Sequence, residues 1–229
     1  MQKTFKIKKE ISAIDLLHWI LGVSMCGFGI CLSTRAGFGL SMISAPPYIM
    51  HVFLKQFFPW YTQGRSEYIW EAFLLILMCI AIRCFRPKYL FSFFTAVVIG
   101  FLIDGFFAIL GGNTVYTTMP GRIAAYVIGT CITCCAIAFV FRTKIPGQVY
   151  ELIVVQVSER YSLNKEKVKL VHDVAMFVIS IALALLLTHS LAGLGVGTII
   201  TTFVNAPLIK MFGMMIDKVE KRGTCAVLQ

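Results

Sequence analysis

The sequence has few charged residues, and this scarcity excludes an ordinary soluble domain. Charged residues make up 14% of the 229 residues, and hydrophobic residues make up 58%. A typical soluble domain has about 25% charged and about 45–50% apolar residues. The apolar residues occur in long blocks, and a helix that crosses a bilayer needs about 20 mostly apolar residues. The sequence therefore predicts a polytopic membrane protein.

Several catalytic and metal-binding patterns are also missing. The chain has no Gly-rich phosphate loop ending in Lys-Ser/Thr, no His-Glu-x-x-His and no Gly-x-Ser-x-Gly, so nothing indicates an ATPase, a zinc protease or a serine hydrolase. The cysteines do not form a disulfide pattern, and Cys131, Cys134 and Cys135 are interpreted as small packing residues rather than metal ligands. We expect no enzyme activity, no cofactor and no metal site.

The apolar blocks predict an all-α fold with six transmembrane helices in a single membrane domain over residues 1–229. A sixth, weaker block is interrupted by glycines, Asn205 and Pro207, and Asn205 either belongs to a polar stripe or marks a helix break. A further stretch, 36–58, is broken by Pro46 and Pro47. The first block lacks a small-residue cleavage site and is expected to remain as a helix. The six blocks are 14–34, 68–86, 89–111, 122–141, 170–189 and 191–214.

The chain has few acidic residues, 11 against 21 Lys and Arg, and carries a net charge of +10. With six crossings, 17 of the 21 basic residues fall on the same side as the N-terminus. This asymmetry follows the positive-inside rule and predicts short cytoplasmic tails at both ends. The lipid bilayer is thus the expected partner, and nucleic acid is not. A homo-oligomer or a partner membrane protein stays open.

An internal repeat is predicted from the first and fourth blocks. WILGVSMCGFGICLSTR (19–35) aligns without gaps on YVIGTCITCCAIAFVFR (126–142), which places Gly22 on Gly129 and Arg35 on Arg142. The repeat unit has three helices, so the second half must enter the membrane inverted, as in many transporters. We predict repeats over about 12–113 and 120–217, each with a broken or re-entrant segment after its first helix. The two arginines are either headgroup anchors or an anion clamp.

Three stretches carry a family resemblance: AGFGLS (36–41), KVKLVHDVAMFVIS (167–180) and GLGVGTIITTFVNAPLIKMF (193–212). With them the chain resembles the YczE/YyaS/YitT-like family of bacterial integral membrane proteins, which is largely uncharacterised. The most specific parts are Lys169 to Asp173 and the Gly-Val-Gly-Thr at 195–198. The resemblance implies a bacterial cytoplasmic-membrane protein of about six helices, and it implies no particular activity.

Two groups of acids stand in or beside apolar blocks. Asp104 lies within GFLIDGFFAIL (100–110), where a charge costs at least ~2.5 kcal/mol on insertion scales. It is expected to face the bundle interior as a proton or cation site, to make a structural hydrogen bond, or to reach toward the outer interface. Glu71, close to Glu67 and Trp70 near the outer end of the second block, is interpreted as an interfacial anchor.

Other polar residues complete the predicted site. Lys169 and Asp173 are four residues apart and can pair on one helix face, either as a surface ion pair or in a functional role. Thr198 and Asn205 belong to a polar stripe that either holds helices together or lines a site. The candidate substrate- or ion-binding residues are Asp104, Glu151, Asn205, Asp173, Lys169, His172, Ser41, Ser44, Gln148 and Thr198.

The leading functional hypothesis is a small secondary transporter of a small molecule or ion, with Asp104 as a proton-coupling site. One alternative is the substrate-binding subunit of a transporter whose ATPase is a separate chain. Another is a non-transporting accessory or assembly factor that binds proteins. A transporter needs a polar cavity that converges on Asp104, Glu151 or Asn205, whereas a scaffold needs a dry core and an apolar outer patch.

Overall fold

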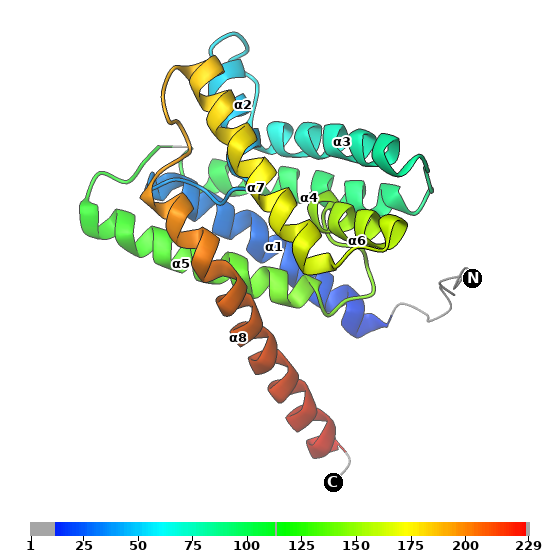
Figure 1. The fold of residues 1–229 in the computed structure, drawn as a ribbon. Helices are drawn as coiled ribbons and strands as arrows, with labels where there is room; N and C mark the ends of the chain where they lie inside the picture. The colour runs from blue at the N-terminus through cyan, green and yellow to red at the C-terminus, as the bar shows by residue number, and fades with distance from the viewer. Residues whose placement is uncertain (1–11, 113, 228–229) are drawn as a thin grey trace.

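The computed structural model describes residues 12–112 and 114–227, which are helical and contain no strand (Figure 1). The all-α prediction is confirmed for these residues. The predicted N-terminal tail before residue 12 lies outside them. The elements are α1 (Ala13–Ala36), α2 (Ala45–Leu54), α3 (Gln63–Ile82), α4 (Tyr89–Ile109), α5 (Met119–Val140), α6 (Val149–Tyr161), α7 (Lys165–Leu183), a π-helical turn η1 (Ala184–Thr188) and α8 (Val196–Val227).

The centre of the bundle is an antiparallel contact between α1 and α5. Gly22 lies against Ala136, and Gly29 lies against Gly129, so the two helices run in opposite directions. A Cβ atom on Gly29 would lie 2.8 Å from the Gly129 carbonyl oxygen, and one on Gly129 would lie 2.9 Å from the Gly29 carbonyl oxygen. Small residues let membrane helices approach this closely. The two helices that align in sequence are therefore partners in space.

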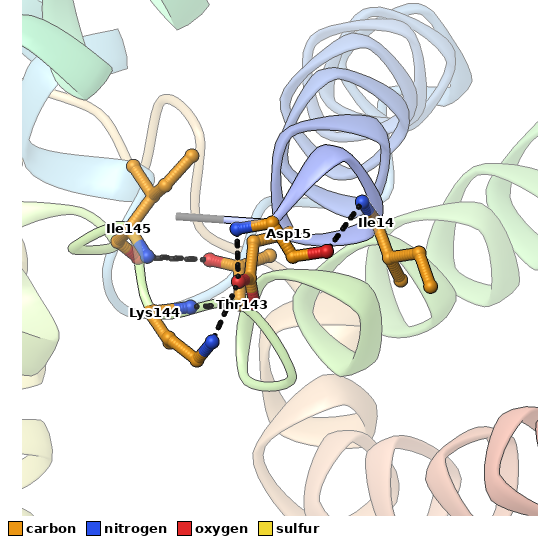
Figure 2. Close-up of polar contacts among 6 residues, drawn as sticks. Ile14, Asp15, Thr143, Lys144 and Ile145 are labelled. Carbon is orange, nitrogen blue, oxygen red and sulfur yellow. Dashed lines mark hydrogen bonds and ion pairs between the residues drawn. The ribbon is translucent and has the colours of Figure 1, made fainter. Parts of the chain in front are cut away.

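A polar cluster fixes the start of α1 against the connection between α5 and α6 (Figure 2). The Ser12 hydroxyl accepts a hydrogen bond from the Ile14 amide, and the Asp15 carboxylate accepts one from the Ser12 amide at 3.0 Å. The same carboxylate accepts from the Lys144 amide at 3.3 Å and pairs with Lys144 Nζ at 3.1 Å. The first two bonds satisfy amides at the start of α1, and the two bonds of Lys144 hold the α5–α6 connection against it.

Most of the other helix contacts in the first predicted repeat recur between the equivalent helices of the second. The pair α1 and α4 is matched by α5 and α8, and the pair α2 and α3 is matched by α6 and α7. Across the halves, α3 packs on α6 and α2 packs on α7. Two contacts have no counterpart. α4 packs on α6, whereas the equivalent helices α8 and α2 do not pack against each other over their described residues. α3 packs along α4, whereas α7 and α8, over their described residues, do not pack against each other. Figure 1 shows the C-terminal part of α8 extending away from the bundle.

Five of the described helices are long and apolar enough to cross a membrane, namely α1, α4, α5, α7 with η1, and α8. The prediction of a membrane-type helical protein is confirmed at this level. α3 does not meet the same criterion, because Arg65, Glu67 and Glu71 lie in its first half. Large apolar side chains cover the outer surfaces, with Phe203 on α8 74% exposed and Ile109 on α4 80% exposed.

Some predicted helix limits were wrong. α3 begins at Gln63 rather than 68, and α7 begins at Lys165 rather than 170. Pro46 and Pro47 lie in the first turn of α2, where the missing amide hydrogen is tolerated. Of the two alternatives for Asn205, the helix break is wrong, because α8 continues through Pro207. A membrane helix tolerates the one hydrogen bond that proline removes.

Candidate functional site

A cavity of about 450 Å³ lies between α5, α6, α7 and α8, at the place where α7 and α8 are apart. The loop at 41–43, which follows α1, bounds it on another side. Ligand sites in proteins have volumes of about 300–1,000 Å³ and combine an apolar lining with a few polar groups. The polar side chains that line this cavity are Ser41, Tyr150, Glu151, Lys169, His172, Asp173, Thr201, Thr202, Asn205 and Lys210.

The cavity brings together six of the ten residues predicted from the sequence. They come from a loop and three helices, and the first and last of them are more than 160 residues apart. They are Ser41, Glu151, Lys169, His172, Asp173 and Asn205. The other four, Asp104, Ser44, Gln148 and Thr198, do not line it. Lys210 was not among the predicted residues, because one lysine in an apolar stretch gave no sign of which face of α8 is covered.

The first turns of α7 hold a polar chain along the cavity wall. Lys169 Nζ lies 3.1 Å from Asp173 Oδ2, and His172 Nδ1 lies 3.4 Å from Asp173 Oδ1. Because a carboxylate only accepts, a hydrogen bond to it places the imidazole hydrogen on Nδ1. His172 is 9% exposed, and its Nε2 is buried without a hydrogen-bond partner among the described residues. In the neutral ring with its hydrogen on Nδ1, that nitrogen is an acceptor.

Glu151 lies in the first turn of α6, which is not one of the five spanning helices. Its Oε2 is buried and has no hydrogen-bond partner among the described residues. Burial raises the pKa of Glu151 to about 7, although the charge of Lys169 and backbone hydrogen bonds oppose the shift. Burial makes the ionised form of Glu151 costly, so this carboxylate readily takes up a proton or binds a cationic partner.

Two further acids lie behind the cavity, on α3. Glu67 is 1% exposed and Glu71 is fully buried, so the interpretation of Glu71 as an interfacial anchor was wrong. Glu71 Oε2 accepts from the Val149 amide at 2.8 Å and so caps the first turn of α6. The acids have the same helical phase as the buried Leu74 and Met78, a periodicity that would have identified the inward face.

Asp104 has a structural position far from the cavity lining. Its carboxylate accepts from the Thr62 hydroxyl at 2.6 Å and from the Gly64 amide at 2.9 Å. Gly64 is in contact with the backbone of Gly100, so α3 and α4 are close here. The acid therefore caps the N-terminus of α3 from the facing helix. This accounts for a carboxylate in an apolar run without a proton-carrying role.

Thr198 and the two glycine-rich segments form a backbone junction between the halves. The Thr198 hydroxyl accepts from the Gly195 amide at 3.2 Å. The Gly197 amide donates to the Phe38 carbonyl at 2.8 Å, and the Leu40 amide donates to the Gly193 carbonyl at 2.9 Å. The loop after α1 is thus joined to the loop before α8. Thr198 supports this junction beside the cavity.

Arg35 and Arg142 have matching contacts in the two halves. Arg35 donates to the Leu110 carbonyl at the end of α4, and Arg142 donates to the Gly213 carbonyl in α8. Arg142 also forms a two-pronged pair with Asp217, at 2.7 and 2.8 Å. Each arginine therefore joins the first helix of its half to the last. The two sequence interpretations, the headgroup anchor and the anion clamp, stay predictions.

A family model described as a family of unknown function (DUF6198) matches residues 13–214. The chain belongs to this family. Searches of curated proteins and of solved structures gave no match. Membership agrees with the prediction of an uncharacterised family, while the YczE/YyaS/YitT-like identity and the bacterial origin stay predictions. Among the described residues no group of three His, Cys, Asp or Glu side chains has the arrangement of a metal site.

Proposed function

We propose that this DUF6198 protein is a small-molecule transporter and that the cavity is its substrate site. The observation that carries the proposal is the convergence of Glu151, Lys169, His172, Asp173 and Asn205 on one cavity of about 450 Å³. Polar and ionisable groups at membrane depth are costly, and they usually mark a substrate or ion pathway. A scaffold has no need of such a cavity, so transport is favoured over the accessory-factor alternative.

We further propose six crossings arranged as two inverted halves, with α3 as the sixth. The acids that remove α3 from the apolar set, Glu67 and Glu71, point inward and would not meet lipid. The antiparallel contact of α1 and α5 supports inversion, because an axis in the membrane plane relates equivalent helices in opposite directions. The contact of Gly22 with Ala136 also corresponds to that of Gly129 with Gly29 when each residue is exchanged for its repeat equivalent.

The proposed topology places the opening of the cavity on the cytoplasmic side. Lys169, near the N-terminal end of α7, and Lys210, in the middle of α8, both line it. The corresponding seam in the first half, between α3 and α4, is closed at Gly64 and Gly100. We infer an inward-open state, with substrate exchange by closing the α7–α8 seam as the α3–α4 seam opens. The location that goes with this is a bacterial cytoplasmic membrane with both termini inside.

The power source and partners follow from the same proposal. Glu151 at the cavity wall is the proposed proton-coupling group, in place of Asp104. Only 11% of the most apolar stretch of α8 is buried. Its exposed surface is available to lipid, to a second copy or to a partner membrane protein. That exposure is also the one observation that supports a subunit powered by a separate ATPase. No enzymatic step, cofactor or nucleic acid enters this function.

The test is uptake from a metabolite mixture into liposomes that contain the purified protein, with the contents analysed by mass spectrometry. Ala206→Trp places a bulky ring in the cavity, because Ala206 lines it. Phe203→Trp, on the same helix, changes a side chain that is 74% exposed to lipid and is the matched control. We expect at least one metabolite to enter in the wild type and the control but not in Ala206→Trp. Equal contents in all three, or in protein-free liposomes, would contradict the proposal.

A further inference from the structure

The cavity contains one acid and one cation that have no ion-pair partner among the described residues. Lys169 and Asp173 neutralise each other at 3.1 Å. Glu151, on α6, has a buried oxygen without a hydrogen-bond partner, and Lys210, on α8, has no salt bridge in the described part of the chain. These two charges come from opposite sides of the gap between α7 and α8.

A second unpartnered group lies on the Glu151 side. His172 Nε2 is buried, and the Asp173 bond at Nδ1 leaves Nε2 as an acceptor. Its ring centroid lies 6.5 Å from that of Tyr150, the residue before Glu151. The carboxylate and the imidazole nitrogen are therefore two acceptors on one wall, an arrangement that suits an ammonium group, which offers three donors. Lys210 lines the same cavity from α8 and has donors only, which suits an anion.

We propose that the substrate is a small zwitterion with an apolar body, its ammonium group bound by Glu151 and His172 and its anionic group bound by Lys210. The inference rests on the transporter proposed above and names its substrate class. An uncharged ligand or an anion alone would leave the buried oxygen of Glu151 without a partner. With an uncharged ligand, the charge of Lys210, which is exposed at the cavity, would also remain unused. The apolar body would contact the rest of the lining, which includes Met42, Ile43, Val154 and Ile209.

This ligand also accounts for the gap between α7 and α8. A molecule that bonds to α6 and α7 at one end and to α8 at the other spans the open seam. Binding would then favour the state in which α8 is closer to α7, because a ligand shifts a conformational equilibrium toward the state with which it makes more contacts. The substrate itself would close the cytoplasmic side.

The experiment uses the full chain in detergent and three water-soluble probes of similar shape. L-leucine carries both charged groups, 4-methylpentanoate lacks the ammonium group, and 3-methylbutylamine lacks the carboxylate. Binding is measured by calorimetry and by ligand-induced thermal stabilisation. We expect leucine to bind, and each single-charge analogue to bind about tenfold or more weakly, since each loses a charged hydrogen bond. A phosphatidylethanolamine headgroup has the same charge pair, so mixed micelles of that lipid form a separate arm that identifies the source.

Two charge-removing variants and two matched controls complete the test. Glu151→Gln and Lys210→Gln should each weaken leucine binding about tenfold. Glu151→Gln should also abolish the preference over 4-methylpentanoate, and Lys210→Gln the preference over 3-methylbutylamine. Glu159→Gln on α6 and Lys218→Gln on α8 remove charges outside the cavity lining and should leave binding unchanged. The melting temperature without ligand shows whether each variant is folded.

The failure of this inference differs from the failure of the proposed function. Equal binding of leucine and a single-charge analogue overturns the zwitterion, as does uptake in liposomes of a substrate with one charge or none. Transport itself survives those outcomes. If neither leucine nor the lipid binds and the metabolite that enters the liposomes is not a zwitterion, the substrate class is again wrong. If nothing binds and nothing enters, the transporter proposal fails with it.

Discussion

Replacing Asp104 tests whether this acid holds two helices together or carries protons. In the structure its carboxylate accepts two hydrogen bonds, from the Thr62 hydroxyl at 2.6 Å and from the Gly64 amide at 2.9 Å. Asp104→Asn keeps one acceptor oxygen and loses one bond. A hydrogen bond to a charged group contributes about 1.5–3 kcal/mol, and the lower end applies because Asp104 is only partly buried. We expect a loss of about 1.5 kcal/mol, and about 3–6 °C in melting temperature for a chain of this size.

The assay is thermal unfolding in detergent, combined with the pH dependence of uptake in liposomes. Thr62→Val removes the hydroxyl donor, so its effect and that of Asp104→Asn should overlap in the double variant. A coupling of at least about 0.5 kcal/mol is expected for two groups in direct contact. Glu159→Gln, an exposed acid on α6, controls for the loss of a charge. An unchanged melting temperature, additive effects and the loss of pH-dependent uptake in Asp104→Asn would refute the structural role and restore the proton-carrying one.

Three further predictions concern the helix contacts and the cavity wall. Gly29→Leu should prevent assembly of the bundle, because a Cβ atom there would lie 2.8 Å from the facing carbonyl oxygen. The loss of monodisperse protein in size-exclusion chromatography would show this, and a stable Gly29→Leu protein would contradict the packing. The control Gly105→Ala has open space around its Cβ atom and should have no effect. Glu71→Leu should cost about 1–3 kcal/mol because it leaves the Val149 amide buried without an acceptor, whereas Glu71→Gln should retain most of the stability, and equal losses would count against the cap. Burial raises the pKa of Glu151 to about 7, so its contribution to stability is greatest below about pH 4.5, falls as the pH rises and is lost above pH 7. Glu151→Gln should therefore reduce the change in melting temperature between pH 5 and 8. An unchanged dependence of the melting temperature on pH would contradict this assignment.

The helices that could be predicted from the sequence are those in which hydropathy alone decides the structure. The blocks 14–34, 89–111 and 122–141 correspond closely to α1, α4 and α5, because an apolar run of about 20 residues has few other options in a membrane. The short helices α2 and α6 were expected only as broken segments, since hydropathy does not distinguish a short helix from a loop. The continuation of α8 through Pro207 depends on the surroundings of the helix, which the sequence does not specify.

The candidate site divides in the same way. Lys169, His172 and Asp173 were found because their spacing places them within one helical segment, and Glu151 because it is an acid in an apolar context. Asp104 drew attention for the same reason and proved to be a cap, because the cost of burial identifies an acid with a partner and does not identify the partner. The inward position of Glu67 depends on the packing of α3 against α6, which is a property of the whole fold.

The difference between the two seams follows from a difference in charge at equivalent positions. Asp104 and Lys210 are 106 residues apart and occupy the last helix of their halves in the proposed repeat. In the first half the carboxylate supplies the acceptor that the N-terminus of α3 needs, so the α3–α4 seam closes without help. Lys210 has three donors and no acceptor, and the N-terminal end of α7 already has its cap in the Asn164 side chain, so no described side chain of α8 closes this seam. A substrate held by Glu151 and His172 at one end and by Lys210 at the other would supply the missing link. The α3–α4 seam thus closes without a ligand, and the α7–α8 seam closes on its substrate. Reversing the charge with Lys210→Asp should draw α8 toward α7 in the absence of any ligand.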